Sequence, residues 1–233
     1  MDEVDFDALI DLAPGGVDHF IGITPRYRLP RVFGGQLVAQ ALRAAQATVA
    51  ADVAAHSLHA SFLRPGMHGE PLRFEVERLR DGRSFVTRRV VARQDHDDVL
   101  HLSASFQRDE DGPDVAPSAP PDGMIDPDEL PDNGWGSVLR RRPELDDGPH
   151  QRLWIAMIGE PSGDDRRDRC GLTFLTDSMV TTAVRRAHPR QIPAAEARRY
   201  FRTASLVAEV FTRDGVHVLT VVQEILIRAP DHA

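Results

Sequence analysis

Two polar residues in the last third of the sequence have the types and positions needed to hold a water molecule. Asp177 interrupts the apolar stretch GLTFLTDSMVTTAV at 171–184, and Gln223 interrupts VHVLTVVQEILIR at 216–228. A polar group buried without a partner costs on the order of 1–3 kcal/mol, and a charged group costs more. An inward carboxylate and an inward amide are therefore candidates for a water-holding pair, with structural pairing of the two side chains as the alternative.

The apolar residues around Asp177 and Gln223 predict that both side chains point inward. The spacing of apolar residues predicts a helix over 170–186, with Asp177 on the flank of its apolar stripe. In the predicted strand, Gln223 shares a face with Leu219, Val221, Ile225 and Ile227. The hydroxyl groups nearest to Asp177 in the sequence are those of Ser178, Thr181 and Thr182.

Other kinds of catalytic site find little support in the sequence. It contains no G-x-S-x-G, P-loop or G-x-G-x-x-G motif. A single cysteine, Cys170, and scattered histidines give no zinc spacing, so we expect neither a metal nor a cofactor. Five arginines at 78–89 surround the turn LRDGRSF and predict either a solvated edge or an anion site.

Composition excludes several classes of partner. The net charge of −8 and the pI near 5.7 disfavour nucleic-acid binding, because no concentrated basic face is evident. Mean hydropathy is −0.33 and no apolar run approaches the roughly 18 residues of a membrane span, so no membrane insertion is expected. The acidic start MDEVDFDALI lacks a signal pattern, which predicts a cytoplasmic protein.

The first half of the chain reads as a helix followed by antiparallel strands. From Phe33 the segment FGGQLVAQALRAAQATVA has apolar residues at helical spacing, beginning after the Gly34-Gly35 pair. Four strands are predicted at 56–63, 71–79, 84–94 and 99–107. This order predicts an α+β fold in which the helix covers one face of the sheet.

The second half repeats this order in shortened form. A strand at 150–159, the helix at 170–186 and a hairpin at 200–228 around Asp214-Gly215 follow a Pro- and Asp-rich stretch. Gln40 and Asp177 differ by 137 positions but Gln107 and Gln223 by only 116, so the second copy lacks about 21 residues, or two strands. We therefore predict repeats at 1–108 and 149–233, joined by a linker at 109–148.

A succession of segments resembles one enzyme family. These segments are RVFGGQLVAQAL, HSLHASFLRPG, LRDGRSFVTRRV, LSASFQ, APSAPPDG, QRLWI and DGVHVLTVVQEILIR. In this order they resemble the acyl-CoA thioesterase II family, whose members are double hotdog proteins. The resemblance covers about 29–125, 150–184 and 203–228, and implies a double hotdog whose second repeat lacks about two strands.

The resemblance also implies a mechanism. In this family an Asp from the second helix, a Gln from the last strand and a Thr or Ser from an intervening strand orient a water for attack on the thioester, without a covalent acyl-enzyme. Asp177 and Gln223 match the first two positions. The strand that carries the hydroxyl is the one missing here, so Ser178, Thr181 and Thr182 stay open as candidates.

The expected activity is hydrolysis of fatty acyl-CoA to free fatty acid and CoA. The alternative is a catalytically impaired double hotdog that binds acyl-CoA or serves a structural role. A hydratase acting on enoyl-CoA is a weaker third possibility, because the usual Asp and His pair near a helix start is not seen. Double hotdogs commonly pair further, and the missing strands should expose a sheet edge, so we expect a homodimer or larger homo-oligomer.

Overall fold

The computed structural model describes residues 5–26, 31–111, 113, 115, 118–133, 137–147, 150–159, 163–178 and 204–225. The chain divides into two compact units. The first comprises Met1–Asp111, Trp135–Leu139 and Met157–Asp177, and the second comprises Gly112–Gly134, Arg140–Ala156 and Ser178–Ala233.

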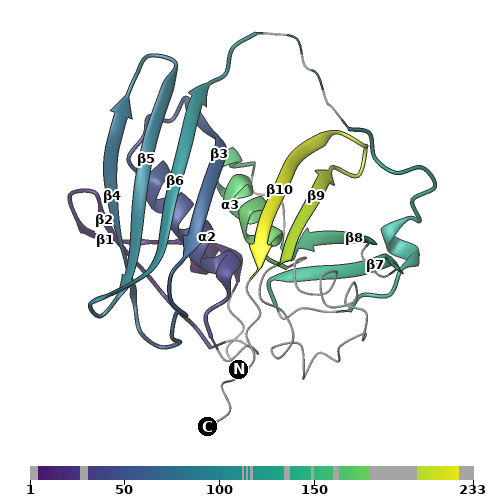
Figure 1. Ribbon diagram of the computed structural model, residues 1–233, viewed down its shortest axis with the longest axis horizontal. Coiled ribbons are helices and arrows are strands. Elements are labelled where there is room, and N and C mark those ends of the chain that lie inside the picture. Colours follow the sequence, from purple (N-terminus) through teal and green to yellow (C-terminus); the bar gives the residue numbers. More distant parts are fainter. Residues whose placement is uncertain are drawn as a thin grey trace. The chain divides into compact units, whose positions relative to one another are not determined.

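A six-stranded antiparallel sheet forms the body of the first unit (Figure 1). Its strand order is β1-β2-β4-β5-β6-β3. The strands are β1 (Ala13–Gly16), β2 (His19–Gly22), β3 (Val53–Phe62), β4 (Leu72–Asp81), β5 (Phe85–Gln94) and β6 (Asp97–Arg108). The four strands predicted from alternating apolar residues are confirmed as β3 to β6, whereas β1 and β2 escape prediction because APGG and HFIG are too short to show a pattern.

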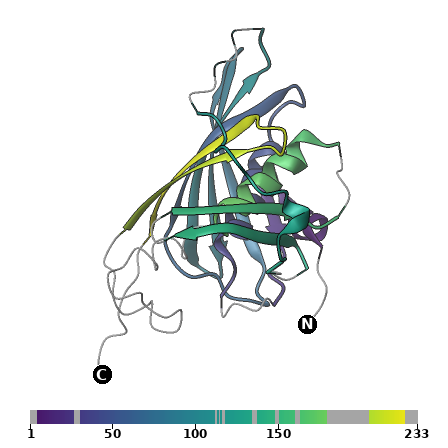
Figure 2. The same cartoon turned by 90° about the vertical axis from the view of Figure 1, so that its right-hand side faces the viewer.

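Helix α2 (Gly34–Gln46) lies along one face of this sheet, as Figure 1 and Figure 2 show. It begins at the predicted glycine pair and contacts β4, β5 and β6. Its apolar stripe, which includes Leu37, Ala41 and Leu42, is at most 2% exposed. The side chains that the sheet contributes to this core include Phe74, Val90, Leu100, Leu102 and Phe106.

Two further helices complete the core of the first unit. The short α1 (Phe6–Ile10) packs on α2 and on α3 (Asp165–Thr176), and α3 also packs on α2. The helix predicted over 170–186 corresponds to α3, which begins earlier and ends at Thr176, and 179–186 lie outside the described residues. The helix begins earlier because the Asp164 side chain caps it by accepting from the Arg166 N–H at 3.0 Å, and Asp177 is the C-cap rather than an interior residue.

The second unit contains smaller sheets. Strand β7 (Leu139–Asp147) pairs with β8 (His150–Met157), and β9 (Ala204–Phe211) forms a hairpin with β10 (His217–Ile225). The hairpin turn is at the predicted Asp214-Gly215, where Gly215 has φ of +89°. The range 109–148, expected to be a Pro- and Asp-rich linker, contains β7 and the 3-10 helix η1 (Pro127–Glu129).

The strand β7 escaped prediction because its sequence LRRRPELDD is mostly charged. A polar strand of this kind carries no apolar alternation, so composition alone assigns it to a loop. Within the described residues, no helix combines the length and the hydrophobicity needed to cross a bilayer.

Candidate active site

The Asp177 side chain lies at the N-terminus of α2. The Gly35 N–H donates a hydrogen bond of 3.1 Å to Asp177 Oδ2, across 142 positions of sequence. Phe33, the N-cap residue of α2, makes no side-chain capping bond, so a carboxylate from α3 takes the place of a local cap. The partial positive charge of a helix N-terminus favours an anion at this position.

The Gly34-Gly35 pair makes this approach possible. A Cβ atom at Gly34 would lie 2.7 Å from Asp177 Oδ2 and 3.0 Å from the Phe62 ring. At Gly35 it would lie only 2.3 Å from the backbone carbonyl oxygen of Phe174. Both distances are too short for a side chain, so these glycines let the end of α3 and its carboxylate touch the start of α2.

The position of α3 is fixed by contacts along its whole length. Near its start, Arg166 Nη1 donates to the Gln46 carbonyl at 2.9 Å, and Gln46 Nε2 donates back to the Arg166 carbonyl at 3.1 Å. Near its end, the Phe174 ring packs edge-on against Phe33 and Phe6, with centroid distances of 4.9 and 5.6 Å. These contacts hold Asp177 in place, and none of them is visible in the sequence.

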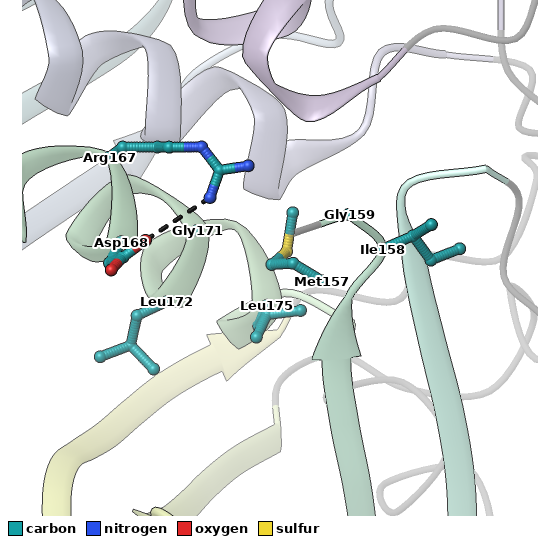
Figure 3. A pocket seen from close by; sticks show the side chains of 8 residues that line it. All are labelled: Met157, Ile158, Gly159, Arg167, Asp168, Gly171, Leu172 and Leu175. Atoms are coloured by element: carbon teal, nitrogen blue, oxygen red, sulfur yellow. Dashed lines mark hydrogen bonds and ion pairs between the residues drawn. The ribbon is translucent and has the colours of Figure 1, made fainter. Parts of the chain in front are cut away.

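A pocket of about 260 Å³ lies on α3 (Figure 3). It is lined by Met157, Ile158, Gly159, Arg167, Asp168, Gly171, Leu172 and Leu175. The charged groups at its rim neutralise one another, because Arg167 pairs with Asp168 at 3.5 Å and also with Asp7. The hydrogen bond to Asp7 raises the pKa of Arg167, and its guanidinium lies 5.5 Å from the centre of the Phe6 ring. The pocket is therefore mostly apolar.

Comparison with known proteins shows what the chain is similar to. The profile of the acyl-CoA thioesterase N-terminal domain matches residues 24–107. Acyl-CoA thioesterase 2 of Haemophilus influenzae is 48% identical over 82 residues, covering 35% of this chain and 29% of that protein. The solved structure of the acyl-CoA thioesterase II TesB2 from Mycobacterium marinum superposes with a TM-score of 0.80 at 28% identity, covering 97% of this chain and 99% of that one. The chain is similar to acyl-CoA thioesterases over residues 24–107, and its fold is similar to that of an acyl-CoA thioesterase II.

Two further comparisons show how much of the chain these similarities cover. Human acyl-coenzyme A thioesterase 8 is 38% identical over 131 residues, covering 53% of this chain and 40% of the human protein. The chain thus spans between 29% and 40% of the length of these curated relatives. A hotdog-fold protein from Alicyclobacillus acidocaldarius, at 17% identity and a TM-score of 0.78, shows the fold alone. The predicted α+β double hotdog with a reduced second half is confirmed.

The second candidate of the thioesterase II site, Gln223, lies on β10 in the second unit. It is half-buried on the face that it shares with Leu219 and Val221, while Thr220 and Val222 on the other face are exposed. The inward face expected for Gln223 is therefore the face it occupies. Asp177 belongs to the first unit, so the pairing of Asp177 with Gln223 stays a prediction.

Only one of the three candidate hydroxyl groups lies in the described part of the chain. Ser178 directly follows Asp177 in the turn after α3 and is half-buried. Thr181 and Thr182 lie outside the described residues. Ser178 is therefore the described candidate hydroxyl, and it is adjacent to Asp177 in the sequence.

The arginines at 78–89 are mainly paired with local carboxylates. Arg78 makes two bonds of 2.8 Å to Asp18 and holds the pKa of that carboxyl below its usual range. Arg89 pairs with Glu77 on the exposed face, and the buried Arg88 pairs with Asp81. Arg78 and Arg89 fit the solvated-edge interpretation, whereas Arg88 is buried. Among the described residues, no group of three or more potential metal ligands occurs.

The two glycines are expected to respond differently to alanine. Gly34→Ala should lower kcat about 10- to 100-fold with little loss of stability, because the methyl group meets the ends of two side chains, Asp177 and Phe62, and no backbone atom. Gly35→Ala should mainly lower the melting temperature, because its methyl group meets the Phe174 backbone. Steady-state kinetics and thermal unfolding of both variants check this. Equal effects of the two substitutions on both quantities would contradict it.

The single cysteine is expected to be inert in the folded protein. Cys170 is fully buried and donates to Gln46 Oε1 at 3.3 Å, and its burial raises the pKa of the thiol to about 12. Because the thiolate is the reactive form, an aromatic disulfide reagent at pH 8 should label it only after unfolding. Rapid labelling of the native protein would contradict this. Thiol-release assays therefore need no correction for the protein's own thiol.

Proposed function

We propose that the chain hydrolyses fatty acyl-CoA to free fatty acid and CoA. The observation that carries this proposal is the Asp177 carboxylate at the N-terminus of α2, 3.1 Å from the Gly35 nitrogen. A base and a helix N-terminus at one point are the two elements that direct attack of water on a thioester requires. The similarity of residues 24–107 to the acyl-CoA thioesterase N-terminal domain, and of the fold to an acyl-CoA thioesterase II, supports the same reaction.

In the proposed reaction, Asp177 removes a proton from a water molecule as the water oxygen bonds to the thioester carbon. The tetrahedral oxyanion forms next to the partly positive end of α2, which stabilises it relative to the neutral thioester. Collapse of this intermediate breaks the carbon–sulfur bond, and the proton held by Asp177 passes to the departing CoA sulfur. A positioned base of this kind contributes about 10²–10⁴ in rate.

Gln223 completes the proposed site by holding the water or the thioester carbonyl. Its support is its half-buried position on the less exposed face of β10, together with the match to the strand Gln of the family. Of the described hydroxyl groups, that of Ser178 is adjacent to Asp177 in the sequence. We assign acyl-CoA as the substrate, and we propose a homodimer or larger homo-oligomer, which light scattering tests.

A binding role without hydrolysis is the second candidate. It is favoured by one observation, namely that the described part of the second unit has only two-stranded sheets where the first unit has six strands. A reduced sheet could retain affinity for acyl-CoA while failing to hold the water in place.

Release of free thiol distinguishes these functions. We expect the full chain to release CoA from at least one member of a series from butyryl-CoA to palmitoyl-CoA. If no member releases CoA but calorimetry still detects acyl-CoA binding, the chain is a binding protein and not a thioesterase. Loss of enoyl absorbance without free thiol would instead indicate a hydratase.

A further inference from the structure

An exposed apolar stripe runs along the edge strand β3. It consists of Leu58, Ala60 and Phe62, of which Leu58 is 38% and Phe62 47% exposed. In the register of β3 with β6 these residues lie opposite Ala104, Leu102 and Leu100, which are at most 1% exposed. Residues opposite one another in a sheet share a face, so the stripe is on the core side, where the sheet also faces α2.

The stripe begins beside the candidate base. A Cβ atom added at Gly34 would lie 3.0 Å from the Phe62 ring and 2.7 Å from Asp177 Oδ2. Phe62 and Asp177 are therefore close to one another. From Phe62 to Leu58 the strand extends for about 13 Å at its usual rise per residue. An apolar surface of this length therefore leads directly away from the place where the thioester would react.

Helix α3 contacts the protein near both ends of the stripe, close to Leu58 and close to Phe62. Near the start of α3, Arg169 Nη1 donates to the Ala55 carbonyl of β3 at 2.8 Å. At the end of α3, Asp177 meets Gly34 next to Phe62. The helix thus runs in the same direction as β3, and the Arg169 side chain crosses to β3 three residues before Leu58.

Two exposed arginines, Arg31 and Arg64, are close in the sequence to Gly34 and to the Phe62 end of the stripe. Arg31 is exposed, and its described bond is to the Met67 sulfur at 2.9 Å, which is a weak acceptor. Arg64 pairs with Asp97 at 3.4 Å, and both side chains are more than half exposed. Arg31 is three residues before Gly34, so its Cα lies within about 11 Å of the site. The Val32 N–H to Gly66 carbonyl bond, 3.0 Å long, ties the two loops together.

We propose that the acyl chain of the substrate lies along β3 from Phe62 to Leu58, with the CoA phosphates over Arg31 and Arg64. This inference rests on the proposed function and adds the direction of the substrate within it. The apolar end of an acyl-CoA matches the uncharged stripe, and its anionic end matches the two arginines. Ala60 and Leu58 then determine the preferred chain length. A second copy of the chain is the other occupant that could cover the stripe.

The test compares substitutions on the two faces of β3. Ala60→Phe should lower kcat/KM for palmitoyl-CoA at least about tenfold and leave butyryl-CoA within about threefold, because the ring blocks the path of the longer chain. Ser61→Phe, which adds the same ring on the opposite face, should keep the wild-type profile. Leu58→Gln, with His59→Gln as its control, tests the far end with a smaller change if Ala60→Phe unfolds.

Three outcomes would overturn the inference. The first is an identical chain-length profile for Ala60→Phe and Ser61→Phe, with Leu58→Gln also unchanged. The second is a loss of mass by light scattering in the stripe variants alone, which would make the stripe an interface between copies. The third is equal calorimetric binding of palmitoyl-CoA by all of these variants.

Failure of the proposed function is a separate result, in which the wild type releases no thiol from any acyl-CoA. In that case the calorimetric comparison alone decides the position of the acyl chain.

Discussion

Asp177→Asn is expected to lower kcat for thiol release by about two to four orders of magnitude. Asparagine preserves the size of the side chain and an oxygen that can accept from the Gly35 N–H. It cannot take a proton from water, so the attack loses its base while the contact between α3 and α2 is kept. Steady-state kinetics with one acyl-CoA, together with thermal unfolding, measure the two consequences separately.

The matched control is Asp168→Asn on the same helix. Asp168 pairs with Arg167 away from the start of α2, so its substitution should change kcat less than about twofold. Full activity in Asp177→Asn would show that this carboxylate is not the base. Loss of activity accompanied by an equal loss of folded protein would reduce Asp177 to a structural cap of α2.

Arg88→Met is expected to lower the free energy of unfolding by about 3–5 kcal/mol. The Arg88 side chain is 1% exposed and ties β5 to the end of α2. Nε donates to Thr48 Oγ1 at 2.8 Å, and Nη2 donates to the Thr48 carbonyl at 3.1 Å and to Asp81. Nη1 donates to the Arg80 and Thr87 carbonyls, both at 3.0 Å. Methionine fills part of the space but leaves these acceptors without their donor.

Its neighbour in the sequence provides the control for this prediction. Arg89 points to the opposite face of β5 and pairs with Glu77, where both side chains are more than half exposed. Exposed pairs contribute about 0–1 kcal/mol, so Arg89→Met should be nearly neutral. Denaturant unfolding of the two variants gives the comparison, and similar midpoints would contradict the role assigned to Arg88.

The sheet of the first unit and its helix follow from local sequence patterns. Strands β4 to β6 alternate apolar and polar residues because one face packs on α2 and the other meets solvent. The Gly34-Gly35 pair marks the start of α2 for a reason that the sequence cannot show. Its role is the close approach of Asp177 and Phe174 rather than flexibility of the chain.

The elements that the sequence missed lack such patterns. The first turns of α3, DRRDR, are charged and are defined by the Asp164 cap and by contacts with α2. The partner of Asp177 lies 142 positions away, and no local periodicity carries information over such a distance. Asp177 is half-buried as the sequence predicts, but it lies at the end of a helix rather than within one.

The first unit is not contiguous in the chain, and this affects how it is made. Its sheet and α2 lie within Met1–Asp111, but α3, which carries Cys170 and Phe174 into the same core, is synthesised more than 50 residues later. Until the ribosome has delivered α3, the side of α2 that packs against it remains uncovered. A fragment cut at the limits of the matched domain, 24–107, would keep that hydrophobic surface permanently and should aggregate.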